Sequence, residues 1–127
     1  MWLALFRVAT QSAKDKLADA VANEPIVFAP FVITELLKGA KNEIEWDALS
    51  GEISKFGILQ IEHETWSKAA RIFYDLQRSS VTVRSSVDCL IAQPCIENFA
   101  TLIHNDRDFD RITTVRPLNH LRLDLSV

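Results

Sequence analysis

Glycine is scarce in this sequence: 127 residues contain three, well below the roughly 7% typical of proteins. This scarcity excludes a P-loop and the glycine-rich dinucleotide-binding fingerprint, which both need several glycines at fixed spacing. Long hydrophobic runs are also absent. The longest apolar stretch, residues 25–33, is roughly half a membrane span. These absences favour a helix-rich globular protein with short loops.

Cysteine is rare as well, and Cys89 and Cys95 form no Cys-x-x-Cys motif. Residues 1–6 are all apolar and have no basic start, which is unlike a secretory signal peptide. We therefore expect two buried thiols in a cytoplasmic protein, because a reducing compartment keeps cysteines free.

An excess of positive charge is missing too. The formal net charge is −3 and the isoelectric point is about 5.6, so no global basic field attracts nucleic acid, although a local basic patch still could. The length, with 48% hydrophobic and 24% charged residues, is typical of one globular domain with its own core. We expect a single domain over residues 1–127.

Short apolar runs alternate with helical patterns along the chain. Such alternation predicts an α/β three-layer sandwich with a central parallel sheet. Pro94 should kink the helix that contains it, because proline removes a backbone hydrogen bond. The expected strands are residues 26–29, 57–61 and 100–104, and the expected helices are residues 2–8, 12–22, 31–38, 43–55, 64–78, 86–98 and 109–113.

Four carboxylates lie shortly after expected strands or, for Asp88, at the start of a helix whose preceding strand is weak or absent. Glu35 lies one turn into the helix after strand 26–29, Asp88 lies in the first turn of its helix, and Asp106 and Asp108 follow strand 100–104. The carboxyl ends of parallel strands meet at one edge of a sheet, where sites form. Clustered carboxylates need a cation, and oxygen ligands suit Mg²⁺ or Mn²⁺.

Each acid also has a simpler explanation. Asp88 can be a favourable contact with a helix dipole, and Glu35 can be solvated. Asp106 and Asp108 can be a turn followed by a helix cap. Spacing alone therefore leaves a metal site open.

The histidines and serines suggest no other chemistry. His63, His104 and His120 show no ligand spacing, so we expect structural or surface roles for them. Ser85 and Ser86 have no nearby base in the sequence, so a nucleophile triad has no support.

Three segments, in order and at matching spacing, resemble the PIN-domain ribonuclease toxins of the VapC type. They are residues 31–40 (FVITELLKGA), 83–92 (VRSSVDCLIA) and 102–110 (LIHNDRDFD). The resemblance implies a three-layer α/β fold that uses Mg²⁺ or Mn²⁺ to cleave RNA, commonly tRNA. It also implies a homodimer and a cognate VapB antitoxin.

The resemblance also assigns roles to single residues. Glu35, Asp88 and Asp106 match the family's acids and would bind the metal, with Asp88 as the best candidate for a direct ligand. Asp108 would be a supporting fourth carboxylate. Asn105 would orient the site, and Arg84 lies where it could contact a phosphate.

One departure concerns the start of the chain. The family begins with a central strand that ends in Asp, followed by a turn and an aromatic residue, and Trp2 stands where that aromatic residue belongs. We therefore expect the strand and its Asp to lie upstream of Met1, which makes the domain N-terminally truncated and leaves two strand edges unpaired.

Truncation of this kind predicts little or no activity for the chain as written. The alternative to an endoribonuclease is a catalytically inactive PIN-like module that still dimerises or binds an antitoxin. A third class, a nuclease acting on DNA flaps, is disfavoured because 127 residues leave little room for DNA-clamping elements.

Overall fold

The computed structural model describes residues 2–4 and 26–122. Five parallel strands form one sheet in the order β3-β2-β1-β4-β5. The predicted α/β class with a parallel sheet is confirmed. The strands are β1 (Trp2–Ala4), β2 (Ile26–Phe28), β3 (Gly57–Ile58), β4 (Thr101–His104) and β5 (His120–Arg122).

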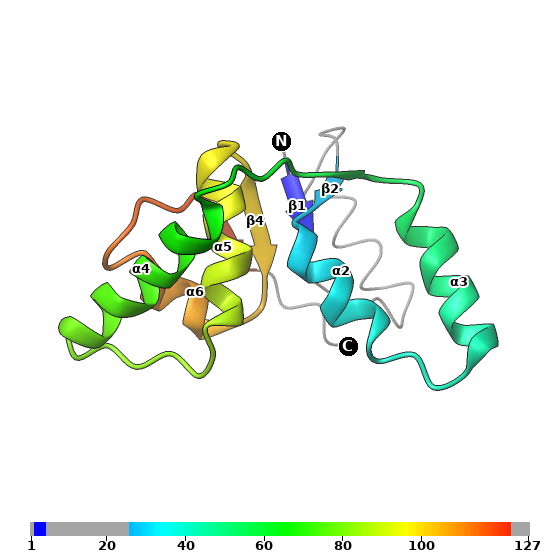
Figure 1. The fold of residues 1–127 in the computed structure, drawn as a ribbon, viewed down its shortest axis with the longest axis horizontal. Coiled ribbons are helices and arrows are strands. Elements are labelled where there is room, and N and C mark those ends of the chain that lie inside the picture. The colour runs from blue at the N-terminus through cyan, green and yellow to red at the C-terminus, as the bar shows by residue number, and fades with distance from the viewer. Residues whose placement is uncertain (1, 5–25, 123–127) are drawn as a thin grey trace.

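Within residues 26–122, five helices follow the predicted order. Helices α4, α5 and α6 lie together beside β4, whereas α2 and α3 lie on the other side of β1 (Figure 1). Pro30 begins α2, where its missing N–H costs nothing, and the Asn42 side chain caps α3 by accepting from the Glu45 N–H at 2.8 Å. The helices are α2 (Pro30–Leu37), α3 (Glu43–Ile53), α4 (Thr65–Arg78), α5 (Val87–Glu97) and α6 (Arg107–Ile112).

The start of the chain differs from the prediction. Trp2–Ala4, expected within a helix over residues 2–8, is a strand whose register aligns Trp2 with Ile26 on one side and with Thr101 on the other. This short strand therefore fills the centre of the sheet, and the expectation of a missing central strand with two unpaired neighbours is wrong. The rest of the expected first helix and the helix expected over residues 12–22 lie outside the described residues.

The core forms where β4, α4 and α5 pack together. Leu102 and Ile103 in β4 are almost fully buried, as expected for a parallel strand covered on both faces. In α4 the buried residues Ala69, Ile72 and Leu76 recur at helical spacing and fix the face that packs on α5. Helix α5 continues through Pro94, which is itself buried.

Both cysteines lie in α5 and are free and buried, as predicted. Burial raises the pKa of Cys89 to about 11 and the pKa of Cys95 to about 12, so both thiols stay protonated and unreactive near neutral pH.

None of the helices in residues 2–4 and 26–122 combines the length and apolar character that crossing a membrane requires.

Candidate metal site at the carboxyl end of β4

Three of the predicted acids meet beyond the carboxyl end of β4. One oxygen from each of Asp88, Asp106 and Asp108 lies within 4.8 Å of the others. Asp88 comes from the first turn of α5, and Asp106 and Asp108 come from the start of α6. We call these three residues the carboxylate cluster.

Helix capping fixes the position of Asp106. It is the N-cap residue of α6, and its Oδ1 accepts a hydrogen bond from the Asp108 N–H at 2.9 Å. The His104 Nδ1 accepts from the Asp106 N–H at 3.1 Å. A helix cap therefore exists, but at Asp106 rather than at Asp108 as the expected helix start implied, and this cap holds the Asp106 carboxylate in the cluster.

Asp108 is fully buried and surrounded by donors. Its Oδ2 accepts from the Arg84 N–H at 3.2 Å and from Arg84 Nε at 3.3 Å, and its Oδ1 accepts from Arg111 Nη1 at 2.5 Å. Burial alone would raise the pKa of Asp108, but these donors outweigh it and hold the pKa below its usual range. Asp108 is therefore a fixed negative charge.

Asp88 carries the opposite perturbation. Burial, a hydrogen bond with Asp108 and the charges of Asp106 and Asp108 raise the pKa of Asp88 to about 7, although Arg84 acts in the other direction. A helix N-terminus normally favours a carboxylate, so burial and the neighbouring acids outweigh the dipole here. The cluster therefore has more negative charge than its arginines neutralise, which is the setting in which a cation binds.

The donor set fits a hard divalent cation. The three carboxylates offer only oxygen ligands, which Mg²⁺ and Mn²⁺ prefer, and one of them is half protonated near neutral pH until a cation takes the place of its proton.

Glu35 is not part of the carboxylate cluster. Its carboxylate pairs with Lys38 Nζ at 2.9 Å on the same helix, α2. The role that the resemblance assigns to Glu35 stays a prediction.

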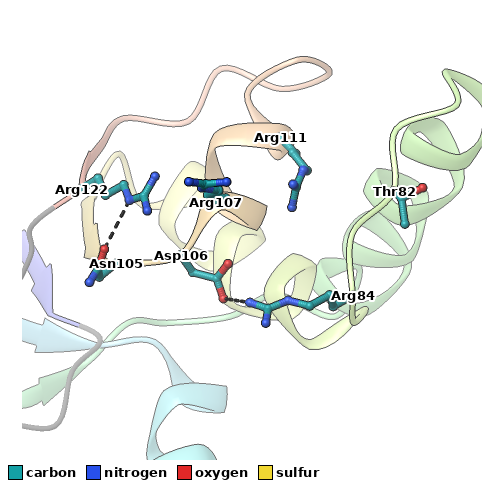
Figure 2. Close-up of a pocket in the computed structure, with 7 residues that line it drawn as sticks. All are labelled: Thr82, Arg84, Asn105, Asp106, Arg107, Arg111 and Arg122. Atoms are coloured by element: carbon teal, nitrogen blue, oxygen red, sulfur yellow. Dashed lines mark hydrogen bonds and ion pairs between the residues drawn. The ribbon is translucent and has the colours of Figure 1, made fainter.

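A cavity of about 530 Å³ opens next to the cluster. Figure 2 shows that arginine side chains surround Asp106 along this cavity. Its lining residues are Thr82, Arg84, Asn105, Asp106, Arg107, Arg111 and Arg122. A protein with a net charge of −3 thus concentrates positive charge beside its carboxylate cluster.

The other two residues assigned by resemblance also line this cavity. Arg84 Nη2 bonds Asp106 Oδ2 at 2.8 Å, so its guanidinium lies on the cluster itself. Asn105 accepts from Arg122 Nε at 3.3 Å through its side chain and makes no recorded bond to the acids. The role that the resemblance assigns to Asn105, orienting the site, stays a prediction.

The sequence reasoning did not single out Arg107, Arg111 or Arg122. A signal existed for Arg111, because it follows Asp108 by three residues, the spacing of helical ion pairs. Arg122 gave no such signal, because it reaches the cavity through the pairing of β5 with β4.

A second group of ligand-type side chains joins His104, Asp110 and His120. His104 Nε2 faces His120 Nδ1 at 2.9 Å. Because His104 Nδ1 accepts from a backbone N–H, its proton must sit on Nε2, the atom that a metal would need without its proton. Burial and His120 lower the pKa of His104 to about 4, which keeps it neutral. This pair therefore joins β4 to β5, as the predicted structural role for both histidines implies.

Comparison with known proteins identifies the family. The PIN domain matches residues 1–115. The chain belongs to the PIN-domain family. It is 34% identical over 113 residues to Ribonuclease VapC51 of Mycobacterium tuberculosis, covering 87% of this chain and 79% of that protein. It is 28% identical over 120 residues to Ribonuclease VapC11 of the same species, covering 92% of this chain and 90% of that protein.

Solved structures share the fold of this PIN domain. VapBC2 from Rickettsia felis, bound to a DNA fragment from its promoter, matches with a TM-score of 0.77 and 22% identity, over 98% of this chain and 100% of that chain. VapBC-1 from nontypeable Haemophilus influenzae matches with a TM-score of 0.72 and 20% identity, over 95% of this chain and 97% of that chain.

Proposed function

We propose that this PIN domain is a metal-dependent endoribonuclease, the toxin of a type II toxin–antitoxin pair, that acts on cytoplasmic RNA such as tRNA. The observation that carries the proposal is the carboxylate cluster beside an arginine-lined cavity. The VapC ribonucleases related in sequence support the reaction class.

The acids of the carboxylate cluster would bind the metal. Asp88 and Asp106 would hold Mg²⁺ or Mn²⁺, with Asp108 fixed behind them by Arg84 and Arg111. A bound divalent ion would polarise the scissile phosphate and lower the pKa of an attacking water. Glu35 would join the site only by releasing Lys38.

The arginines would supply the RNA contacts. Guanidinium groups match phosphate geometry and give most of the affinity for a nucleic-acid backbone. Arg107 has an exposed side chain, and no ion pair is recorded for it within residues 2–4 and 26–122. It is therefore available to bind a phosphate without first breaking a contact.

Cleavage of total tRNA by the purified protein, with Mn²⁺ or with a chelator, tests this function. We expect cleavage that requires the metal and that falls roughly 100-fold in Asp106→Asn, since loss of a ligand misplaces the reacting groups. The matched control is Asp110→Asn, which removes an acid from the same helix but outside the carboxylate cluster. Metal-independent cleavage, or equal losses in both variants, would refute the assignment.

The inactive module remains the second candidate, and one observation favours it. The family's central strand ends in Asp, but here Leu5 follows β1 and the first acid in the sequence is Asp15. We propose that Leu5→Asp, which places an acid directly after β1, would cleave tRNA faster than the unsubstituted chain. Equal rates would show that three carboxylates suffice.

We also propose that a VapB-like antitoxin or a second copy of the chain packs on the exposed apolar side chains of α3 and β3. Ile44, Trp46 and Ile58 are 83%, 44% and 55% exposed, more apolar surface than an isolated short helix and edge strand require. The fold neighbours were solved as VapBC proteins, which is consistent with a partner of this kind.

A further inference from the structure

The guanidinium of Arg84 lies where a cation of the carboxylate cluster belongs. Its Nη2 bonds Asp106 Oδ2 at 2.8 Å while its Nε bonds Asp108 Oδ2 at 3.3 Å, so one side chain bridges two of the three acids (Figure 2 shows the bond to Asp106). The other arginine on the cluster, Arg111, bonds only Asp108.

This contact uses the oxygen of Asp106 that a metal would need. Asp106 Oδ1 already accepts a hydrogen bond from the capping N–H of Asp108, so Oδ2 is the carboxylate oxygen that the helix cap does not use. A carboxylate oxygen has two acceptor positions, but a guanidinium and a divalent ion on the same oxygen repel each other strongly at such short range. Arg84 and the metal therefore compete for Asp106.

The structure also shows that Arg84 can leave at little cost. Its side chain is 76% exposed, so moving it disrupts little packing. Its backbone N–H bonds Asp108 Oδ2 independently of the side chain, and Arg111 stays on Oδ1. Asp108 would thus keep donors on both oxygens after the guanidinium moves away.

We propose that Arg84 is a built-in counter-ion of the carboxylate cluster that the metal displaces, and that the released guanidinium then binds an RNA phosphate in the adjoining cavity. The proposal rests on the metal site proposed above. It makes metal binding and RNA binding cooperative, because the metal frees one of the four arginines that line the cavity.

The first step, displacement of Arg84 by the metal, is tested by measuring metal affinity in the absence of RNA. We would titrate Mn²⁺ into the metal-free protein by calorimetry and expect Arg84→Gln to bind Mn²⁺ roughly five- to twentyfold more tightly than the unsubstituted protein, since a charged hydrogen bond no longer has to be broken. Arg107→Gln is the matched control, because it removes the same charge from the same cavity without touching the acids. We expect its Mn²⁺ affinity to change less than twofold.

A charge-conserving variant separates the effect of losing the Arg84 contact from the effect of losing its positive charge. Arg84→Lys keeps the positive charge but loses the planar fork that reaches both acids, so we expect tighter Mn²⁺ binding here as well.

The second step, RNA binding by the released guanidinium, is measured as the affinity for a labelled RNA hairpin in the presence of Ca²⁺. We expect Arg84→Gln and Arg107→Gln to weaken RNA binding by similar factors.

The outcomes distinguish this inference from the proposed function. If the unsubstituted protein and Arg84→Gln both fail to bind Mn²⁺, the metal site itself is wrong and the inference falls with it. If the unsubstituted protein binds Mn²⁺ but Arg84→Gln binds it equally or more weakly, only the inference is overturned. If Arg107→Gln tightens Mn²⁺ binding as much as Arg84→Gln, general electrostatics explains the effect and displacement is refuted.

Discussion

The carboxyl end of β4 and the outer end of the sheet at α3 and β3 use their side chains in opposite ways. Beyond β4, polar groups are buried and paired: Asp108 is fully buried with a donor on each oxygen, and the described side chains include no buried polar atom without a partner. Around α3 and β3, apolar groups are exposed instead, and α3 contains no fully buried residue. We call α3 and β3 the outer arm.

This contrast separates stability from recognition. Buried charges are expensive unless donors remain on them, so the buried acid beyond β4 should tolerate little change. Exposed apolar side chains contribute little to the folding of one chain, so the outer arm should tolerate much change while it determines binding. Substitutions at the two ends can therefore break or sharpen the comparison.

The largest effect should come from Asp108→Ala. This change removes a buried charge that three donors from Arg84 and Arg111 contact, and it leaves the Arg84 backbone N–H without its partner. We expect the free energy of unfolding to fall by about 2–3 kcal/mol, measured by urea denaturation. Asp110→Ala is the control on the same helix, with an expected loss below about 1 kcal/mol because its contacts are exposed and long. Similar small losses in both would show that the end beyond β4 is no more constrained than the surface.

An effect of intermediate size should appear as a pH dependence of the free energy of unfolding, caused by Asp88. Its pKa rises from the ordinary value of 3.8 to about 7 on folding, so between these values the native state binds more protons than the unfolded state. Stability without metal is therefore fully present below the unfolded pKa and falls as pH rises through about 7. Asp88→Asn should remove this fall.

The measurement is urea denaturation of the metal-free protein on both sides of that range. After allowance for solvent screening, we expect Asp88→Asn to be more stable by roughly 1–2 kcal/mol above pH 7, with the advantage shrinking steadily as the pH falls and nearly gone at the unfolded pKa of 3.8. A variant whose advantage does not depend on pH would show that Asp88 is not the group that titrates.

The sequence predicted the acids better than their surroundings. Asp88, Asp106 and Asp108 could be placed together because local motifs set them at the carboxyl end of a strand and at two helix starts, and these elements formed within a few residues of the expected bounds. Arg84 as a counter-ion of the acids was out of reach, because it depends on how the loop before α5 folds against α6, far away in the sequence.

Short strands explain the errors in the fold. Trp2–Ala4 was assigned to a helix because a brief apolar run has no periodicity that separates strand from helix. Its identity as a strand depends on β2 and β4, which are distant in sequence. The same reason hid β5, whose three residues pair with β4. Long amphipathic α4 was predicted within one residue because its pattern is local.

The smallest effect on folding should come from the outer arm. Ile44→Lys and Ile58→Lys replace side chains that are 83% and 55% exposed, so we expect the free energy of unfolding to change by no more than about 0.5 kcal/mol. Binding should respond differently, because a lysine in the centre of an apolar interface is left charged and desolvated. We expect light scattering to show a weaker dimer, or co-purification to show loss of a VapB-like antitoxin.

Phe99→Lys is the matched control: Phe99 is 85% exposed but belongs to the turn between α5 and β4 and not to the outer arm. If all three variants bind equally well, the outer arm is ordinary surface. If instead Ile44→Lys alone unfolds the protein, its side chain packs in the folded chain and the division between the two ends fails.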